Sequence, residues 1–97
     1  MQFLLIARDG RDALKRRLAL REEHLAVASV LKASGNLLYG VAMLDDAGQP
    51  NGSMEVVQFD SRADLDRWLA REPFVTGEVW AEVNVTPCRV GPMFGTR

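Results

Sequence analysis

The chain has 97 residues, a formal net charge of -1, 47% hydrophobic residues and 26% charged residues. This size predicts one domain over residues 1–97, and the composition is typical of a globular protein rather than a disordered one. A nearly neutral chain has no overall field to gather nucleic acid. Its apolar runs are also too short for a signal peptide or a membrane span, so we expect a cytoplasmic protein with neither nucleic-acid nor membrane partners.

Cysteine usage and motif content limit the chemistry. Cys88 is the single cysteine, so it has no intrachain disulfide partner, and no second cysteine or histidine lies near it in the sequence to form a metal site. The chain also has no phosphate-binding loop, dinucleotide fingerprint or nucleophile elbow. We therefore expect no metal and no cofactor.

The first quarter of the chain predicts a strand followed by a long helix. Residues 1–7 form a short apolar run that suits a central strand buried on both faces, and Arg8-Asp9-Gly10 supplies a turn. Asp9 or Asp12 is the expected N-cap of a helix that continues to about Ser34. At 1.5 Å per residue such a helix is about 33 Å long, which exceeds the strand beneath it, so we expect a bend or a break.

A polar triplet within this helix is the best indication of function. At about 100° per residue, Arg17, Arg21 and His24 fall between two apolar flanks. These flanks are Leu20, Val27 and Leu31 on one side, and Leu14, Leu18 and Leu25 on the other. A helix that needed only a core contact would carry leucine at the triplet, because unpaired buried charges are costly. The alternative is that the helix bends near Arg21 and turns the triplet to solvent.

The rest of the chain alternates strand and helix signals. We expect strands at residues 37–44, 53–60 and 78–90, a hairpin loop at 45–52 and a helix at 62–71 capped by Ser61. Residues 72–77 are expected to form a loop or one irregular turn, and the tail at 91–97 is frayed or laid across a partner. Gly40 marks a bulge or a close backbone approach in its strand. The resulting order, βαββαβ, predicts a ferredoxin-like α+β fold, with an antiparallel sheet and both helices on one face.

Such a sheet leaves its second face uncovered, and a chain this short has nothing left to cover it. We therefore expect a homodimer in which two sheets pack face to face. Phe59, Val83 and Val85 are residues of the type that such an interface uses.

Several short motifs together resemble the YciI-like family over nearly the whole chain. They are the opening strand, R-E-E-H-L at 21–25, S-G-N-L-L-Y-G at 34–40, Gly52-Ser53, and E-P-F-V-T-G at 72–77. The resemblance implies a ferredoxin-like, dimeric α+β barrel, related in fold to muconolactone isomerase, with an active site centred on a histidine and a carboxylate. His24 matches the histidine. The family's carboxylate is typically an aspartate before Pro-Phe or Pro-Tyr, and this chain has Glu72 there, one methylene longer.

We expect both helices to follow parallel neighbouring strands, which brings Glu72 to face His24. A carboxylate on one ring nitrogen fixes the tautomer and leaves the other nitrogen to move a proton. His24 and Glu72 are therefore the candidate catalytic pair, and the candidate substrate-binding residues are Arg21, Ser53, Arg17 and Phe74. The structural alternatives are a surface ion pair for Arg21, a turn-terminating hydroxyl for Ser53 and a core position for Phe74.

Two classes of function remain open. In the first, the protein is a small cofactor-independent enzyme, a lyase or isomerase with His24 as general acid and base. Its substrate is then a small aromatic-derived or unsaturated acid, and its reaction an isomerisation or a dehydrohalogenation. In the second, it is a non-catalytic module that binds a small molecule or supports another enzyme of a pathway. The polar triplet favours the enzyme, whereas the change to Glu72 and the lack of a nucleophile favour the module.

Overall fold

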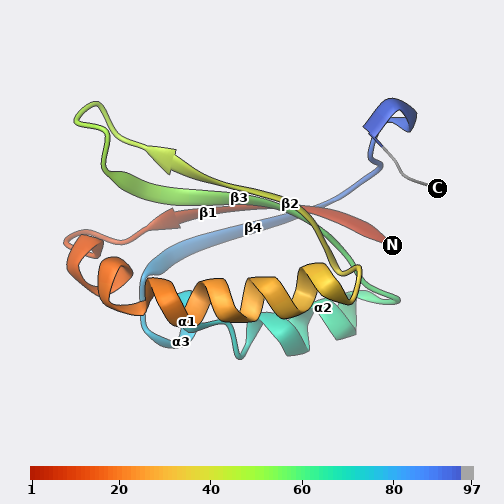
Figure 1. Ribbon diagram of the computed structural model, residues 1–97, viewed down its shortest axis with the longest axis horizontal. Coiled ribbons are helices and arrows are strands. Elements are labelled where there is room, and N and C mark those ends of the chain that lie inside the picture. Colours follow the sequence, from red (N-terminus) through yellow and green to blue (C-terminus); the bar gives the residue numbers. More distant parts are fainter. Residues whose placement is uncertain (95–97) are drawn as a thin grey trace.

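A computed structural model of the protein describes residues 1–94 and confirms the ferredoxin-like α+β fold (Figure 1). The elements, in chain order, are β1 (Gln2–Asp9), α1 (Leu14–Ala33), β2 (Leu37–Leu44), β3 (Pro50–Gln58), α2 (Arg62–Leu69), α3 (Pro73–Thr76), β4 (Trp80–Cys88) and a 3-10 turn, η1 (Pro92–Phe94). The strands form one antiparallel sheet in the order β2-β3-β1-β4. All three α-helices cover the same face of this sheet. Within residues 1–94, no helix is both long enough and apolar enough to cross a membrane.

The core lies between the sheet and the helices. Phe3, Leu5 and Ala7 of β1 alternate toward the helices and are buried. Leu4 and Ile6 point to the other face and are only half-buried, so β1 is not buried on both faces as predicted. The core is completed by a second group of buried residues: Ala13, Val57, Phe59, Leu65, Trp68, Phe74, Val79 and Trp80.

The uncovered face of the sheet is apolar, but it consists of other residues than those predicted. Val83 and Val85 pack against the core, and Phe59 is buried against Trp68 on the helix side. The prediction was wrong because the sequence alternation alone did not show which side of each strand faces the helices. The apolar residues that alternate to the open face are Leu4, Ile6, Tyr39, Val41, Met54 and Val56.

Helix α1 is one unbroken helix of 20 residues, without the predicted break. Its N-cap is Ala13, which makes no side-chain cap hydrogen bond, so neither predicted cap is correct. Asp9 binds Arg17 instead, and Asp12 has a positive φ of 59° in the turn. The flank formed by Leu20, Val27 and Leu31 packs on the core, whereas Leu18 and Leu25 on the other flank are exposed.

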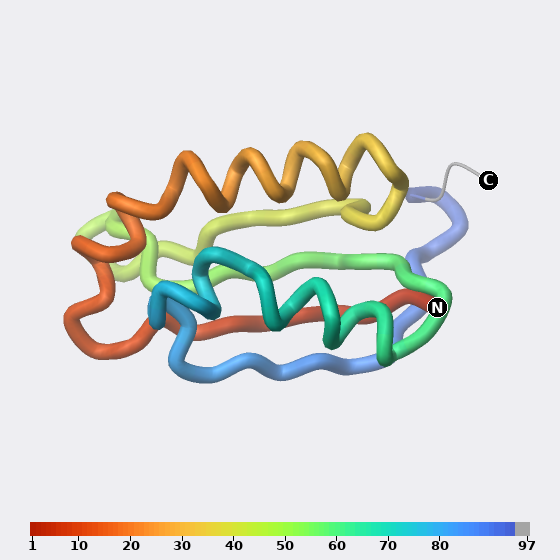
Figure 2. Tube along the Cα trace, turned by 90° about the horizontal axis from the view of Figure 1, so that it is seen from below, coloured from red at the N-terminus to blue at the C-terminus, as the bar shows by residue number. Residues whose placement is uncertain are grey.

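The second half of the chain places α2 and α3 beside α1 (Figure 2). Ser61 caps α2 as predicted, because its side chain accepts a hydrogen bond from the Asp64 backbone N–H. Residues 73–76, predicted as a loop or one irregular turn, form the short helix α3 of four residues. Strands β1 and β3 run antiparallel, so α1 and α2 are also antiparallel (Figure 2) and the assumption of parallel strands was wrong. The end of α2 therefore lies beside the first half of α1.

The two edge strands, β2 and β4, contain the positions at which the sequence analysis expected an irregularity. Strand β4 ends at Cys88, and Pro87 is tolerated within it because β4 is an edge strand. In β2, the register shifts between Leu37 and Tyr39 rather than at Gly40, which pairs with Glu55. Of the tail, residues 92–94 form η1, and residues 95–97 lie outside the described part of the chain.

Candidate functional site

His24 and Glu72 form the centre of the candidate site. Nδ1 of His24, on α1, lies 2.5 Å from Oε1 of Glu72, the residue that precedes α3. Proline restricts the residue before it to extended backbone, and Glu72 has φ -63° and ψ 126°. This conformation lets Oε1 also accept a hydrogen bond of 3.2 Å from the Phe74 N–H as the cap of α3. The cap thus holds the carboxylate in place for the imidazole, and Glu72 is only 1% exposed.

Aromatic rings hold the imidazole on its other sides. Phe74 stacks on His24 with ring centroids 4.0 Å apart and planes 7° from parallel. Trp80 meets the His24 ring edge-on, with centroids 6.0 Å apart. Phe74 is 1% exposed, so it forms part of the wall that orients the histidine. A substrate contact by Phe74 stays a prediction.

Glu55, on β3, is the residue of this site that the sequence analysis missed. Its Oε2 lies 3.8 Å from Nε2 of His24, on the side of the ring away from Glu72. Its Oε1 is buried and has no hydrogen-bond partner within residues 1–94. Burial is the main cause that raises the pKa of Glu55 to about 7; Glu72 raises it further, and His24 and Arg17 oppose the shift. The alternation Ser53, Glu55, Val57 along β3 was the available signal, since it puts Glu55 on the face of Ser53.

Arg17 and Ser53 lie close to His24 in a buried hydrogen-bond network. One guanidinium nitrogen of Arg17 donates to both oxygens of Asp9, at 2.9 and 3.1 Å, and the other donates to Ser53 Oγ at 3.0 Å. Trp80 Nε1 also donates to Ser53 Oγ, at 3.3 Å. Burial raises the pKa of Asp9, although Arg17 opposes the shift. The guanidinium lies 4.8 Å over the Phe74 ring, so Arg17 and His24 share one aromatic neighbour.

Arg21 is not brought into this network. It is exposed, and no hydrogen bond or ion pair joins it to any of the described residues. At about 100° per residue, the buried arc of α1 is centred between Arg17 and Leu20, which turns Arg21 toward the exposed flank with Leu25. The expectation that Arg21 is buried was therefore wrong, and its binding of a substrate stays a prediction.

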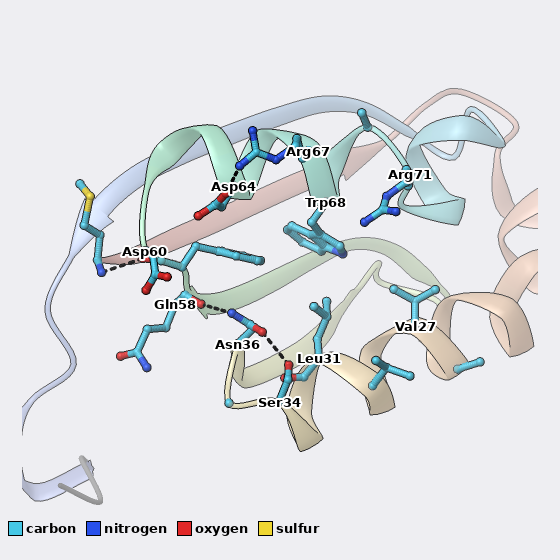
Figure 3. Close-up of a pocket in the computed structure, with 16 residues that line it drawn as sticks. Val27, Leu31, Ser34, Asn36, Gln58, Asp60, Asp64, Arg67, Trp68 and Arg71 are labelled. Atoms are coloured by element: carbon cyan, nitrogen blue, oxygen red, sulfur yellow. Dashed lines mark hydrogen bonds and ion pairs between the residues drawn. The ribbon is translucent and has the colours of Figure 1, made fainter.

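The structure has a hollow away from His24. A groove of about 1410 Å³ lies between α1 and α2, where Val27 and Leu31 face Trp68 (Figure 3). Neither His24 nor its two carboxylates line it. In the described part of the chain, no three histidine, cysteine or acidic side chains are grouped to hold a metal ion.

The fold and this arrangement define a class of small α+β proteins with a ferredoxin-like sheet and a histidine on the first helix that meets a carboxylate. The chain belongs to the YCII-related domain family, whose model matches residues 1–89, so the predicted resemblance is confirmed. Protein YciI of Escherichia coli O6:H1 is 31% identical over 93 residues, which cover 90% of this chain and 95% of that protein. An uncharacterized protein of Haemophilus influenzae is 33% identical with the same coverage.

Solved structures share the fold. The 5-chloro-2-hydroxyhydroquinone dehydrochlorinase TftG of Burkholderia phenoliruptrix AC1100, in complex with 2,5-dihydroxybenzoquinone, gives a TM-score of 0.84 at 23% identity, over 96% of this chain and 98% of that chain. An antibiotic biosynthesis monooxygenase gives 0.54 at 16% identity, over 94% and 98%. At these identities the likeness concerns the fold.

Proposed function

We propose that the protein is a small cofactor-independent enzyme in which the His24–Glu72 pair moves a proton on a small organic substrate. The observation that carries this proposal is the 2.5 Å contact between His24 Nδ1 and Glu72 Oε1. A carboxylate on Nδ1 places the ring proton there, which leaves the lone pair of Nε2 as the base. Stacking against Phe74 fixes the direction in which Nε2 acts.

The proposed substrate class is a small aromatic-derived or unsaturated acid, and the reaction an isomerisation or a dehydrohalogenation. TftG supports this choice, because its name describes removal of chloride from a hydroxylated ring and its complex holds a dihydroxyquinone. Both reactions begin with removal of a proton by a positioned base. Since Arg17 is paired with Asp9, a substrate carboxylate would have to compete with Asp9 for it or bind elsewhere.

We also propose that the working form is a homodimer. Leu4, Ile6, Met54 and Val56 lie together on the open face of the sheet, in adjacent positions of β1 and β3. A contiguous apolar patch of this kind favours a self-complementary contact between two copies. Sedimentation at micromolar concentration tests it, and a monomer of 10.8 kDa would count against it.

Two measurements test the enzyme. The first is calorimetric titration with 2,5-dihydroxybenzoquinone, and the second is ¹H NMR of phenylpyruvate in D₂O, which follows loss of the protons next to the carbonyl. We expect the parent protein to bind the quinone and to speed the exchange, and His24→Asn to lose the exchange. Glu22→Gln is the matched control, because Glu22 is an exposed residue of the same helix. Binding without exchange in the parent would favour the non-catalytic module.

A further inference from the structure

We infer that Glu55 is the acid partner of His24, so that the two residues act on opposite ends of a small enolisable carbonyl compound. The inference rests on the proposed function of His24 as a base. Glu55 faces the ring nitrogen that Glu72 does not occupy, and its side chain comes from the sheet whereas His24 comes from the helix above it.

The charges around Glu55 favour a protonated carboxyl. Arg17 is paired with Asp9 and the His24 ring is bound by Glu72, so neither group is a dedicated partner of Glu55. The ionisable groups that face Glu55 are His24 and Arg17 from α1 and Glu72 from the segment before α3. Of these, the Glu72 carboxylate opposes ionisation of Glu55. A buried carboxylate without a dedicated partner is costly, so the neutral acid is preferred.

This charge balance agrees with the pKa of about 7 for Glu55. A neutral buried carboxylic acid can donate a hydrogen bond or a proton to a substrate oxygen at neutral pH. The Oε1 atom, buried and without a hydrogen-bond partner within residues 1–94, is available for that purpose.

The distance between the Glu55 carboxyl and the His24 imidazole suits a reaction at both ends of one small substrate fragment. Oε2 and Nε2 are 3.8 Å apart, which is too far for a mutual hydrogen bond. In the forward step, Nε2 of His24 takes a proton from the carbon beside a carbonyl, and the C–H electron pair becomes the C=C bond of an enol. The Glu55 O–H gives its proton to the carbonyl oxygen. The site then holds an imidazolium and a carboxylate.

The return step restores the enzyme without any other reactant. The imidazolium gives its proton to the far carbon of the unsaturated system, and the enol O–H returns its proton to Glu55. The net result is a 1,3-proton shift that moves a double bond. A β,γ-unsaturated ketone or keto acid is therefore the substrate class that this pair fits.

Gly40 lies at the sheet edge beside Glu55. It pairs with Glu55 across β2 and β3, and a Cβ at position 40 would lie 3.7 Å from Glu55 Cγ. Gly40 is exposed on an edge strand, so no side chain at this position covers Glu55. In the proposed reaction, the substrate reaches the acid past this residue.

The first test measures the protonation of Glu55 directly. In ¹³C NMR of protein labelled at the glutamate carboxyl carbons, we expect one signal that titrates near pH 7 and is missing from Glu55→Gln. Glu82→Gln, which changes an exposed glutamate, is the control and keeps that signal. If all glutamate carboxyls are ionised by about pH 6, Glu55 is not a neutral acid and the inference is overturned.

The second test separates this inference from the proposed function, with cyclohex-3-enone and phenylpyruvate as probes. We expect Glu55→Gln to lower turnover about 100-fold or more, because an amide donates a hydrogen bond but no proton. If Glu55→Gln matches the parent while His24→Asn loses activity, the role of Glu55 is wrong and the proposed function stands. If the parent is as inactive as His24→Asn on both probes, the proposed function fails and this inference fails with it.

Discussion

Replacing Glu55 by glutamine should make the protein more stable at alkaline pH. Folding raises the pKa of this carboxyl from its ordinary value of 4.5 to about 7, because burial disfavours the charged form. Between these two values the folded state binds more protons than the unfolded state. The free energy of unfolding therefore falls as pH rises through this window. Glutamine does not titrate, so Glu55→Gln removes this loss.

The magnitude follows from the shift. At about 1.4 kcal/mol per pKa unit, ionising Glu55 costs about 3 kcal/mol of stability once the pH is well above 7. We therefore expect Glu55→Gln to exceed the parent by up to about 3 kcal/mol at pH 8, and to match it only below about pH 4, where the carboxyl is protonated in both the folded and the unfolded state. For a domain of this size, 3 kcal/mol raises the unfolding temperature by at least about 10 °C.

Urea unfolding followed by tryptophan fluorescence, at a series of pH values from about 4 to 8.5, measures this difference. Glu82→Gln, an exposed change of the same kind, should leave the pH dependence as it is in the parent. The reasoning is refuted if Glu55→Gln is less stable than the parent at pH 8, or if the two differ by the same amount at every pH. Either result would mean that the carboxyl is ionised, with a favourable partner, throughout the range.

Three other changes test separate parts of the structure. Arg17→Met should destabilise the fold by about 3 kcal/mol in urea unfolding, because it leaves the Asp9 carboxylate buried without its partner; Arg16→Met, a change in an exposed arginine, should cost far less. Met54→Asp should convert the proposed homodimer to monomers in sedimentation, since it places a charge on the open face; an unchanged dimer would locate the interface elsewhere. Gly40→Val should raise KM for the probe ketones, because its side chain covers the sheet edge beside Glu55, and should leave the fold intact, because its Cβ makes only ordinary contact with Glu55; an unchanged KM would mean that the substrate does not pass Gly40.

The order of elements could be predicted because each has its own local signal. The Ser61 cap, the turn at Asp45 and the glycine after α1 mark boundaries that depend on nearby residues alone. The open face could not be assigned in the same way. Val83 and Leu4 both suit a half-buried strand, and only the packing of the helices decides which of them faces the core.

The site was predicted only as far as one helix face and one motif allow. His24 was singled out as a polar residue on an apolar face, and Glu72 through the motif before Pro-Phe. Glu55 was not singled out, because its place beside His24 depends on a register between three strands. Asp9 was one of two expected helix caps. In the structure it pairs with Arg17 instead, and the local sequence does not show this contact.

In the proposed mechanism, Glu72 holds the proton of His24 on Nδ1 and leaves Nε2 as the base. ¹⁵N NMR of the imidazole, recorded at a pH high enough for a neutral ring, reports directly which nitrogen carries the proton. His24 is the single histidine, so its signals need no separation from others. We predict the Nδ1–H tautomer in the parent and in Glu22→Ala, and its loss in Glu72→Ala. A ring protonated mainly on Nε2 in the parent would contradict this role of Glu72.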